Sequence, residues 1–404
     1  MLKIPKINIE EYKYDLPDER IAQYPVNERG SSKLLLYNKG NISEDVFSNI
    51  ANYLPGNSLL VFNNTRVIRA RLLFRKATGA IIEIFCLEPV NPADYEKSFS
   101  STGPVEWKCI IGNLKKWKDN EISLRFPFNG SEKELKAEKI MAAGEAWIIR
   151  FSWDDGKITF CDVTEAAGHI PLPPYVKRED ESADDIRYQT VYSSIKGSVA
   201  SPTAGLHFTR KIISSIHERG FRSVELTLHI GAGTFKPVRA TDISKHEMHC
   251  EHFFITGNLI RDLLLYEGKT IAIGTTSVRT LESLYWLGAG LACKSANDNG
   301  LNVGQWDPYI NVAEISFGDS MASLLGQMEK KGVDYLHGST TLMIVPGYRF
   351  RVINGMVTNF HQPGSTLLLL VSAYTGNKWK DIYNYAMGNG YRFLSFGDTS
   401  LLIE

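Results

Sequence analysis

The local pattern of the chain changes near residue 71, and this change constrains the fold more than any other feature. Between about 71 and 156, short strand-like runs follow one another (AIIEIFCLE, EWKCII, EISLRF and EAWIIRF), separated by turn residues and with no strong helix between them. Closely spaced strands joined by turns are typical of small all-β barrels and sandwiches. We therefore expect residues 71–156 to form a small all-β domain that resembles a barrel.

The regions before and after this segment alternate between strands and helices. SLLVF (58–62) predicts a buried strand, and KTIAIG predicts a strand that leads into the helix TTSVRTLESLYWL. Such alternation is typical of a mixed α/β domain. We expect a main mixed α/β domain made of residues 1–70 and 157–404, into which the β-barrel-like domain of 71–156 is inserted.

Three local patterns give further predictions. Ser43 is a suitable N-cap for a helix in SEDVFSNIANYL, and Asn354-Gly355 is the strongest hairpin signal in the chain. The stretch 287–339 is rich in Gly, Asn and Asp. It predicts a partly ordered loop region with one helix near 321–331.

The overall charge excludes a generic polyanion binder, because 45 basic residues are balanced by 45 acidic ones. Any contact with nucleic acid must come from a local basic patch. The five cysteines are widely spaced, without a C-x-x-C pair, which favours a reducing compartment. The N-terminus lacks the apolar core of a signal peptide, and the longest apolar run, 367–371, is too short to cross a bilayer. We expect a cytoplasmic protein with no membrane contact.

Three common nucleotide or hydrolase motifs are missing. GAGTF (231–235) is followed by lysine where a dinucleotide fold needs a third glycine. GKT (268–270) resembles the end of a phosphate-binding loop, but Leu263 occupies the position of its first glycine. No G-x-S-x-G elbow occurs. The sequence therefore gives no support for NAD, ATP or α/β-hydrolase chemistry.

Four polar clusters stand at predicted strand–helix junctions. They are SPTAGLHFT (201–209), HIGAGTF (229–235), GTTSVR (274–279) and NFHQPGST (359–366). Helix N-termini offer free N–H donors, and small residues let a ligand approach them. Each cluster alone is also explained by ordinary capping and turn residues. Because three of the four contain histidine, we expect them to form one polar crevice at a sheet edge, suited to a carboxylate or hydroxyl-rich ligand.

Two further clusters have competing interpretations. The spacing in HEMHCEH (246–252) differs from H-E-x-x-H, and no distant Cys/His pair completes a zinc set, so we expect no metal. The alternative is a loop whose His249 and Glu251 face a pocket together. Arg69, Arg71 and Arg75 would share one face of a strand, either as phosphate ligands or as a solvated surface.

A series of blocks in this chain resembles one family, the S-adenosylmethionine:tRNA ribosyltransferase-isomerases. In order they are YDLPDERIAQYP (14–25), NNTRV (63–67), GHIPLPPY (168–175), RYQTVY (187–192), GSVASPTAGLHFT (197–209), TLHIGAGTFKPV (227–238), H-x-M-H-x-E (246–251), AIGTTSVRTLES (272–283), VPGY (345–348), TNFHQPGSTLLLLVSAY (358–374) and YRFLSFGD (391–398). The blocks span almost the whole chain.

The resemblance implies a mixed α/β domain with an inserted β-barrel. It also implies a tRNA substrate that carries 7-aminomethyl-7-deazaguanine in the anticodon. S-adenosylmethionine would be the co-substrate, used for its ribose, and the products would be epoxyqueuosine-tRNA, adenine and methionine. No metal is implied, and we expect a monomer.

The implied chemistry suggests roles for the clustered residues. The sulfonium centre acidifies neighbouring ribose C–H bonds, so a neutral histidine is a suitable base, and His207 and His229 are the leading candidates. His249, Glu251 and His361 are candidates for acids and donors. Residues expected to bind substrate are Thr275, Thr276 and Ser277 (methionine carboxylate), Arg66 and Arg279 (carboxylate or phosphate), Asp398 (ribose hydroxyl or aminomethyl ammonium), and Asn63, Asn64, Thr65, Thr203, Gly205, Gly231, Gly233 and Thr234.

The chain departs from the expected family pattern at four positions. Asn64 stands where aspartate is usual, Arg69 where proline is usual, Lys33 where arginine is usual and Gln362 where leucine is usual. The alternatives are therefore a paralogue with altered RNA specificity and a non-catalytic RNA-binding paralogue. A metallohydrolase that uses the 246–252 cluster is a third.

Overall fold

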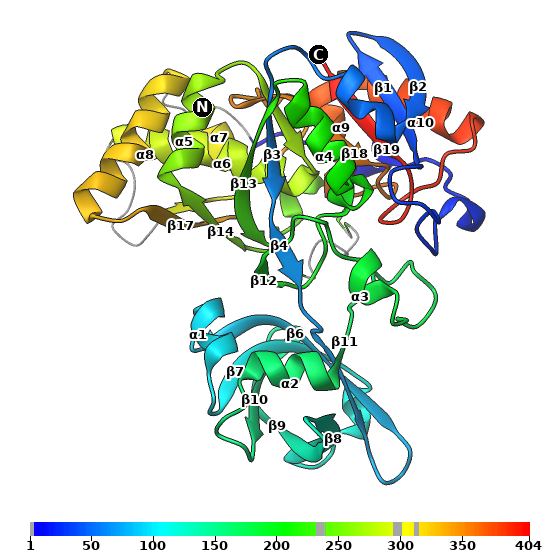
Figure 1. The fold of residues 1–404 in the computed structure, drawn as a ribbon, viewed down its shortest axis with the longest axis vertical. Helices are drawn as coiled ribbons and strands as arrows, with labels where there is room; N and C mark the ends of the chain where they lie inside the picture. The colour runs from blue at the N-terminus through cyan, green and yellow to red at the C-terminus, as the bar shows by residue number, and fades with distance from the viewer. Residues whose placement is uncertain (1–3, 232–237, 239, 294–300, 311–314) are drawn as a thin grey trace.

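The computed structural model describes residues 4–231, 238, 240–293, 301–310 and 315–404. Figure 1 shows a larger upper part built around one sheet and a smaller lower part built around another. Within the described ranges, the larger sheet has ten strands in the order β16-β17-β14-β13-β3-β15-β18-β19-β1-β2. Their bounds are β1 Lys33–Asn38, β2 Asn41–Val46, β3 Leu59–Asn63, β13 Arg222–His229, β14 Glu251–Thr256, β15 Thr270–Ile273, β16 Leu301–Val303, β17 Tyr335–Thr340, β18 Ile353–Asn359 and β19 Thr399–Ile403.

The centre of this sheet is parallel. β3 pairs in parallel with β13 and β15, and β15 pairs in parallel with β18. Every residue of β3 and β15 is buried, as expected for parallel strands covered on both faces. The carboxyl ends of these four strands consequently meet at one edge of the sheet, the usual place for a ligand in such folds.

Two hydrophobic clusters lie on opposite faces of the larger sheet. Val61 of β3 packs in one cluster with Leu281 of α6, and Leu60 packs in the other with Ile212 of α4 and Phe47. The helices of the larger part are α4 Arg210–Glu218, α5 Gly257–Leu265, α6 Thr275–Ala292, α7 Asp307–Ile310, α8 Phe317–Lys331, α9 Thr366–Thr375 and α10 Trp379–Gly388. Short 3-10 helices are η1 Ile9–Tyr12, η2 Asp18–Arg20, η3 Phe47–Asn52, η5 Thr203–His207, η7 Ile243–Lys245 and η8 Gly376–Lys378.

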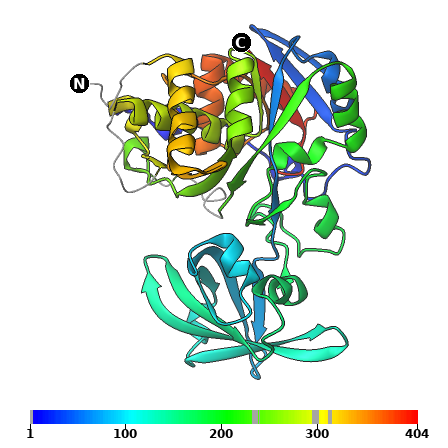
Figure 2. The same cartoon turned by 60° about the vertical axis from the view of Figure 1, so that its left-hand side comes forward.

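The smaller sheet is curled and antiparallel (Figure 2), with the strand order β11-β5-β6-β7-β10-β9-β8. It encloses its own hydrophobic cluster, in which Trp107 and Phe151 pack against Phe160 of α2. The strands are β5 Arg71–Arg75, β6 Ile81–Asn91, β7 Val105–Gly112, β8 Glu121–Phe128, β9 Ser131–Ala143, β10 Ala146–Trp153 and β11 Gly168–His169, with helices α1 Tyr95–Ser100, η4 Leu114–Lys116 and α2 Phe160–Ala167. The four predicted strand-like runs lie in β6, β7, β8 and β10.

Short elements connect the two parts. A two-stranded parallel sheet is formed by β4 Thr65–Val67 and β12 Ile195–Ser198, and α3 spans Asp184–Arg187. Among the described helices, none is both long and apolar enough to cross a membrane. The expectation of a mixed α/β fold with a separate antiparallel β region is confirmed at this level.

Two local predictions are wrong. Ser43 does not cap a helix, because it lies in β2, which pairs with β1, and only the 3-10 helix η3 follows. Asn354-Gly355 is not a hairpin turn, because both residues lie inside β18, beside a register shift against β15. There a Cβ on residue 355 would lie 2.6 Å from Ile271 Cδ1. The glycine thus serves close packing between strands rather than a turn.

The prediction for residues 287–339 is confirmed in part. The expected helix is α8, which begins earlier than expected, after its N-cap Ser316. The described remainder also contains the end of α6, β16 and α7.

Candidate functional site

A small pocket of about 70 Å³ lies at the carboxyl ends of β15 and β18, and we call it the junction pocket. Three of the four polar clusters supply its wall, and Ile230 of the remaining cluster also lines it. The expected crevice at one sheet edge is therefore present. The predicted site residues that line it are Thr203, Thr275, Thr276 and His361; the others include Tyr175, Ser201, Asn359, Gln362, Ser365, Thr366 and Ser395.

Two helices begin at the junction pocket. α6 follows Gly274, whose φ of 91° and lack of a side chain leave the first turn without a side-chain cap. α9 follows Ser365, whose hydroxyl accepts from Leu368 N at 3.2 Å. Each helix start carries free N–H donors and a positive dipole end. The pocket is thus suited to an anion such as a carboxylate.

Ser277 differs from its two neighbours. Its hydroxyl donates to Ile273 O at 2.7 Å, and its side chain is fully buried. It therefore stabilises the first turn of α6 and does not line the pocket, whereas Thr275 and Thr276 do.

A chain of hydrogen bonds leads from the junction pocket into the protein. Thr203 donates to Asn359 Oδ1 at 3.0 Å, and Asn359 Nδ2 lies 3.3 Å from His207 Nε2. His207 Nδ1 lies 2.7 Å from Ser32 Oγ. Since an amide nitrogen can only donate, Nε2 accepts and the proton of His207 is on Nδ1. His207 thus stands behind Asn359 and orients it, beside a separate small cavity of about 20 Å³.

Burial keeps the histidines of this region neutral. Desolvation lowers the pKa of His207 to about 3, with Arg392 and Arg29 adding to the effect. Desolvation alone lowers the pKa of His361 to about 3. His361 Nε2 lies 2.8 Å from Thr358 Oγ1. Near pH 7 both side chains therefore act as neutral hydrogen-bonding groups.

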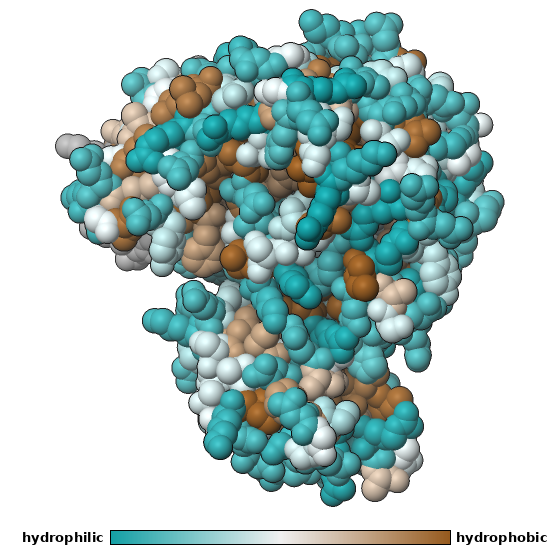
Figure 3. Space-filling view, in the orientation of Figure 1, coloured by the Kyte–Doolittle hydropathy of each residue, from teal (hydrophilic) through white to brown (hydrophobic). Residues whose placement is uncertain are grey.

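A second cavity, of about 470 Å³, lies between the larger and the smaller part, and we call it the His229 cavity. Figure 3 shows the molecular surface hollowed between the two parts. The larger part contributes His229, Gly231, the segment 246–250 and His252 to its wall. The smaller part contributes Leu87, Glu88, Tyr95, Lys108, Ile110, Ala143, Glu145 and Ala146. Because Ile230 lines the junction pocket while its neighbours His229 and Gly231 line the His229 cavity, the two sites adjoin at the end of β13.

His229 is held between rings. It stacks on Tyr95 with centroids 4.3 Å apart and packs edge-on to Phe254 at 5.7 Å. Its Nδ1 is buried without a hydrogen-bond partner among the described residues. Desolvation lowers its pKa to about 4, helped by His252 and His337. Gly197 makes this position possible, since a Cβ there would lie 2.6 Å from His229 Cε1.

His249, Glu251 and Arg279 form a connected group at the edge of this cavity. His249 Nε2 lies 3.1 Å from Glu251 Oε1, and Arg279 Nη1 lies 3.0 Å from Glu251 Oε2. Glu251 and Arg279 are almost completely buried, while His249 lines the cavity. Glu251 therefore connects the buried guanidinium to the imidazole. No set of three or more His, Cys, Asp or Glu side chains that could hold a metal was found in the part of the chain that the structure describes.

Several predicted substrate-binding residues have other partners. The side chain of Asn63 accepts a hydrogen bond from Leu228 N of β13 at 3.1 Å. The side chain of Asn64 forms hydrogen bonds with Glu225 and Thr227, at 3.0 and 2.8 Å. Thr65 is buried in β4 and Arg66 is exposed there. Gly205 packs closely against Tyr192, because a Cβ on residue 205 would lie 2.0 Å from Tyr192 Oη. The carboxylate of Asp398 accepts hydrogen bonds from the backbone N–H groups of Lys33 and Arg392, at 3.0 and 2.8 Å. Gly233 and Thr234 lie outside the described residues. The substrate-binding roles of all these residues stay predictions.

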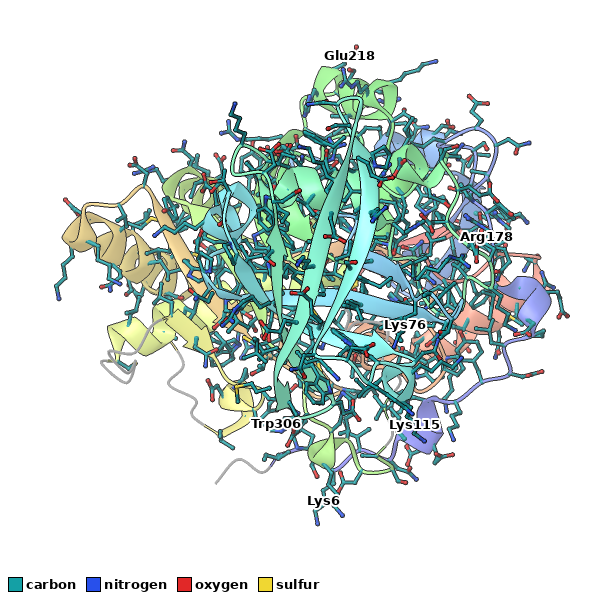
Figure 4. The ribbon with its side chains drawn as sticks, turned by 90° about the horizontal axis from the view of Figure 1, so that it is seen from below. Lys6, Lys76, Lys115, Arg178, Glu218 and Trp306 are labelled. Carbon is teal, nitrogen blue, oxygen red and sulfur yellow. The ribbon has the colours of Figure 1, made fainter. Side chains whose placement is uncertain are left out.

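The positions that depart from the family pattern are engaged in the fold. Arg69 Nε donates to Asp185 Oδ1 at 3.0 Å, and Lys33 Nζ donates to Asn389 O at 2.7 Å. Gln362 lines the junction pocket. Of the expected arginine face, Arg71 also pairs with an acid, Glu83, at 2.6 Å. On the underside of the molecule, Lys76 pairs with Asp119 at 2.6 Å, and Figure 4 labels it with Lys115.

Sequence reasoning missed two groups of site residues. Asn359 lies inside a predicted cluster but was not singled out, although its position two residues before His361 was a usable signal. Tyr95 of α1, Glu88 of β6 and Lys108 of β7 come from the smaller part, and no local pattern marked them. They reach the His229 cavity only through the packing of the two parts.

Comparison with known proteins covers nearly the whole chain. The family described as "Queuosine biosynthesis protein" matches residues 9–402. The S-adenosylmethionine:tRNA ribosyltransferase-isomerase of Trichlorobacter lovleyi is 36% identical over 402 residues, covering 98% of this chain and 99% of that protein. The protein of the same name from Treponema denticola is 35% identical over 400 residues, covering 97% and 99%. A crystal structure of S-adenosylmethionine tRNA ribosyltransferase from Thermotoga maritima is 26% identical, covers 97% of this chain and 100% of that chain, and has a TM-score of 0.47.

Proposed function

Because this chain belongs to the queuosine biosynthesis protein family, we propose that it remodels a tRNA base. It transfers and isomerises the ribosyl moiety of S-adenosylmethionine onto 7-aminomethyl-7-deazaguanine in the tRNA anticodon. The products are epoxyqueuosine-tRNA, adenine and methionine. One observation carries the proposal: two helix N-termini open into a pocket that borders a larger cavity containing a buried neutral histidine.

The methionine carboxylate binds in the junction pocket. The backbone N–H groups at the starts of α6 and α9 are donors, and the hydroxyls of Thr275 and Thr276 stand beside them. Asn359, oriented by His207, offers an amide at the same wall. These groups are neutral, so they bind a carboxylate without repelling the nearby sulfonium.

The nucleoside part extends into the His229 cavity, which has the larger volume. A sulfonium acidifies the adjacent ribose C–H bond, so His229 takes up the proton on a ring nitrogen as general base. Tyr95 fixes the imidazole plane by stacking. His249, backed by Glu251, is placed to return a proton to a leaving group. No metal takes part in this scheme.

We propose the following organisation for this activity. Residues 71–156 form the inserted β-barrel-like domain, and 1–70 with 157–404 form the main domain. The proposal is supported by a hydrophobic cluster that is separate from the main one and that also takes in Phe160 of α2. The enzyme works as a cytoplasmic monomer. The free state of all five cysteines is consistent with a reducing compartment.

The proposal is tested by incubating the pure protein with S-adenosylmethionine and tRNA. Adenine and methionine should appear only when the tRNA carries the aminomethyl base, and unmodified tRNA serves as the control. Salt-sensitive tRNA binding without adenine release would instead indicate the non-catalytic paralogue. In that case Asn64→Asp, which restores the aspartate usual in the family, would test whether Asn64 is the cause of the lost activity.

Gly274→Ala should weaken S-adenosylmethionine binding by about tenfold or more, with little change in turnover at saturation. The φ of 91° at residue 274 strains any side chain by ~1–3 kcal/mol, and relaxing that strain moves the α6 N–H groups. Isothermal titration measures the affinity. Gly268→Ala is the matched control, since its φ is 73° but no atom lies near its Cβ position. Equal affinity in both variants would remove the α6 N-terminus from the binding site.

A further inference from the structure

The outer face of β13, β14 and β17 carries a group of rings that the reaction scheme does not use. Alternate residues of these strands point away from the core, and register pairs Phe254 with His337 and His252 with Ser339. Their sequence neighbours Phe253 and Leu336 are buried in the core. We call the exposed set the ring face; it consists of His252, Phe254, Tyr335 and His337.

The rings pack on one another across the strands. Phe254 and His337 stack with centroids 4.6 Å apart and planes 14° apart. His252 stacks on His337 at 5.3 Å, and Tyr335 lies 6.2 Å from Phe254. Together they form an almost continuous aromatic surface that is held in place before any ligand arrives.

The ring face is accessible. Tyr335 is 57% exposed. His337 is exposed, and His252 and Phe254 are half-buried. Burial and the neighbouring His252 lower the pKa of His337, so its imidazole is uncharged near pH 7. His337 therefore adds no charge to the ring face near pH 7, and the most exposed ring is that of Tyr335.

The ring face is continuous with the His229 cavity. His252 belongs to both, and Phe254 packs edge-on against His229. Figure 1 shows β14 and β17 along the lower margin of the larger part, facing the smaller part. An RNA chain whose target base enters the His229 cavity must leave it on both sides, so its adjoining nucleotides must lie on the surface next to the opening.

We propose that the ring face binds unpaired nucleotides adjoining the target nucleotide by stacking their bases on Tyr335, His337 and Phe254. The inference rests on the proposed function, because it assumes that RNA enters the His229 cavity. Bases in single-stranded loops are free to stack on aromatic side chains, and every base has a π-face. Such a surface recognises the unpaired state of the loop rather than one sequence.

Alanine substitutions of the exposed rings test this proposal. Tyr335→Ala and His337→Ala should each weaken binding of a fluorescent anticodon stem–loop RNA by about tenfold. Tyr335→Phe and His337→Phe should bind like the wild type, because they keep a ring. Ser339→Ala, on the same face of β17, is the control without a ring. Turnover at saturating tRNA and S-adenosylmethionine affinity should stay unchanged in the Tyr335 and Ser339 variants, whose side chains do not act on the pKa of His229.

The outcomes separate this inference from the proposed function. If both alanine variants bind RNA as tightly as the wild type and the wild type still releases adenine, the ring face does not bind RNA, while the proposed function stands. If the alanine substitutions weaken binding of a fully paired RNA as much as binding of the stem–loop, stacking of unpaired bases is also rejected. A wild-type dimer that Tyr335→Ala dissociates would make the ring face a contact between two copies, again against the proposal. Loss of loop binding in an enzyme that releases no adenine would support the ring face while rejecting the function.

Discussion

Arg279→Met is expected to lower the free energy of unfolding by about 3–5 kcal/mol and to reduce turnover strongly. The guanidinium is 3.0 Å from Glu251, and the two side chains are only 4% and 0% exposed. Removing the positive partner leaves a buried carboxylate without its compensating charge. Glu251 also contacts His249, so its displacement alters the His229 cavity. Chemical denaturation measures the first effect and adenine release the second.

A surface ion pair provides the control for this variant. Arg150 lies 2.8 Å from Glu106, with the arginine side chain 45% exposed, so Arg150→Met should change the free energy of unfolding only slightly. The double variant Glu251→Gln/Arg279→Met should be less destabilised than the sum of the two single variants. If Arg279→Met lost no more free energy of unfolding than Arg150→Met, the buried pair would contribute no more to stability than the surface pair.

Stability should fall steeply as the pH drops below about 6.5. Burial lowers the pKa of His207 and His361 to about 3 and of His229 to about 4 in the folded protein. In the unfolded chain these residues take up protons near pH 6.5, which favours unfolding progressively until the folded pKa values are reached. Three protons correspond to a slope of about 4 kcal/mol per pH unit, approached near pH 5.

Denaturation curves at several pH values measure this slope. Above about pH 8 the three histidines should contribute almost no slope, because both states are then neutral. His361→Gln should remove about one third of the slope between pH 6 and 5. Burial also lowers the pKa of His246 and His337, which adds to the slope in the same direction. A flat profile between pH 7 and 5 would contradict the buried neutral state of the three side chains.

The sequence predicted the sheet edge well because the relevant signals are local. The end of a buried strand followed by small polar residues and a helix marks a junction, and parallel strands bring such ends together. Thr276 and His361 were therefore found without coordinates. His207 and His229 look alike in sequence, but only their surroundings show that one orients Asn359 while the other faces a cavity.

The wrong local predictions have a common cause. Ser43 is a good N-cap and Asn354-Gly355 a good turn, yet pairing of β2 with β1, and of β18 with both its neighbours, outweighs these preferences. The pairing of β18 joins residues far apart in the sequence and is not encoded in a short window, whereas β2 follows β1 after a two-residue turn, so that pairing is local. Tyr95 of α1 was also unpredictable, since it meets His229 only through packing between the two parts of the molecule.

The most direct test of the account follows the sugar. S-adenosylmethionine radiolabelled either in its ribosyl carbons or in its methyl group is incubated with the pure protein and tRNA bearing the aminomethyl base. We expect ribosyl label to enter the tRNA in step with adenine release, and methyl label to leave with methionine. Methyl label in the tRNA, or adenine release without ribosyl label in the tRNA, would contradict it.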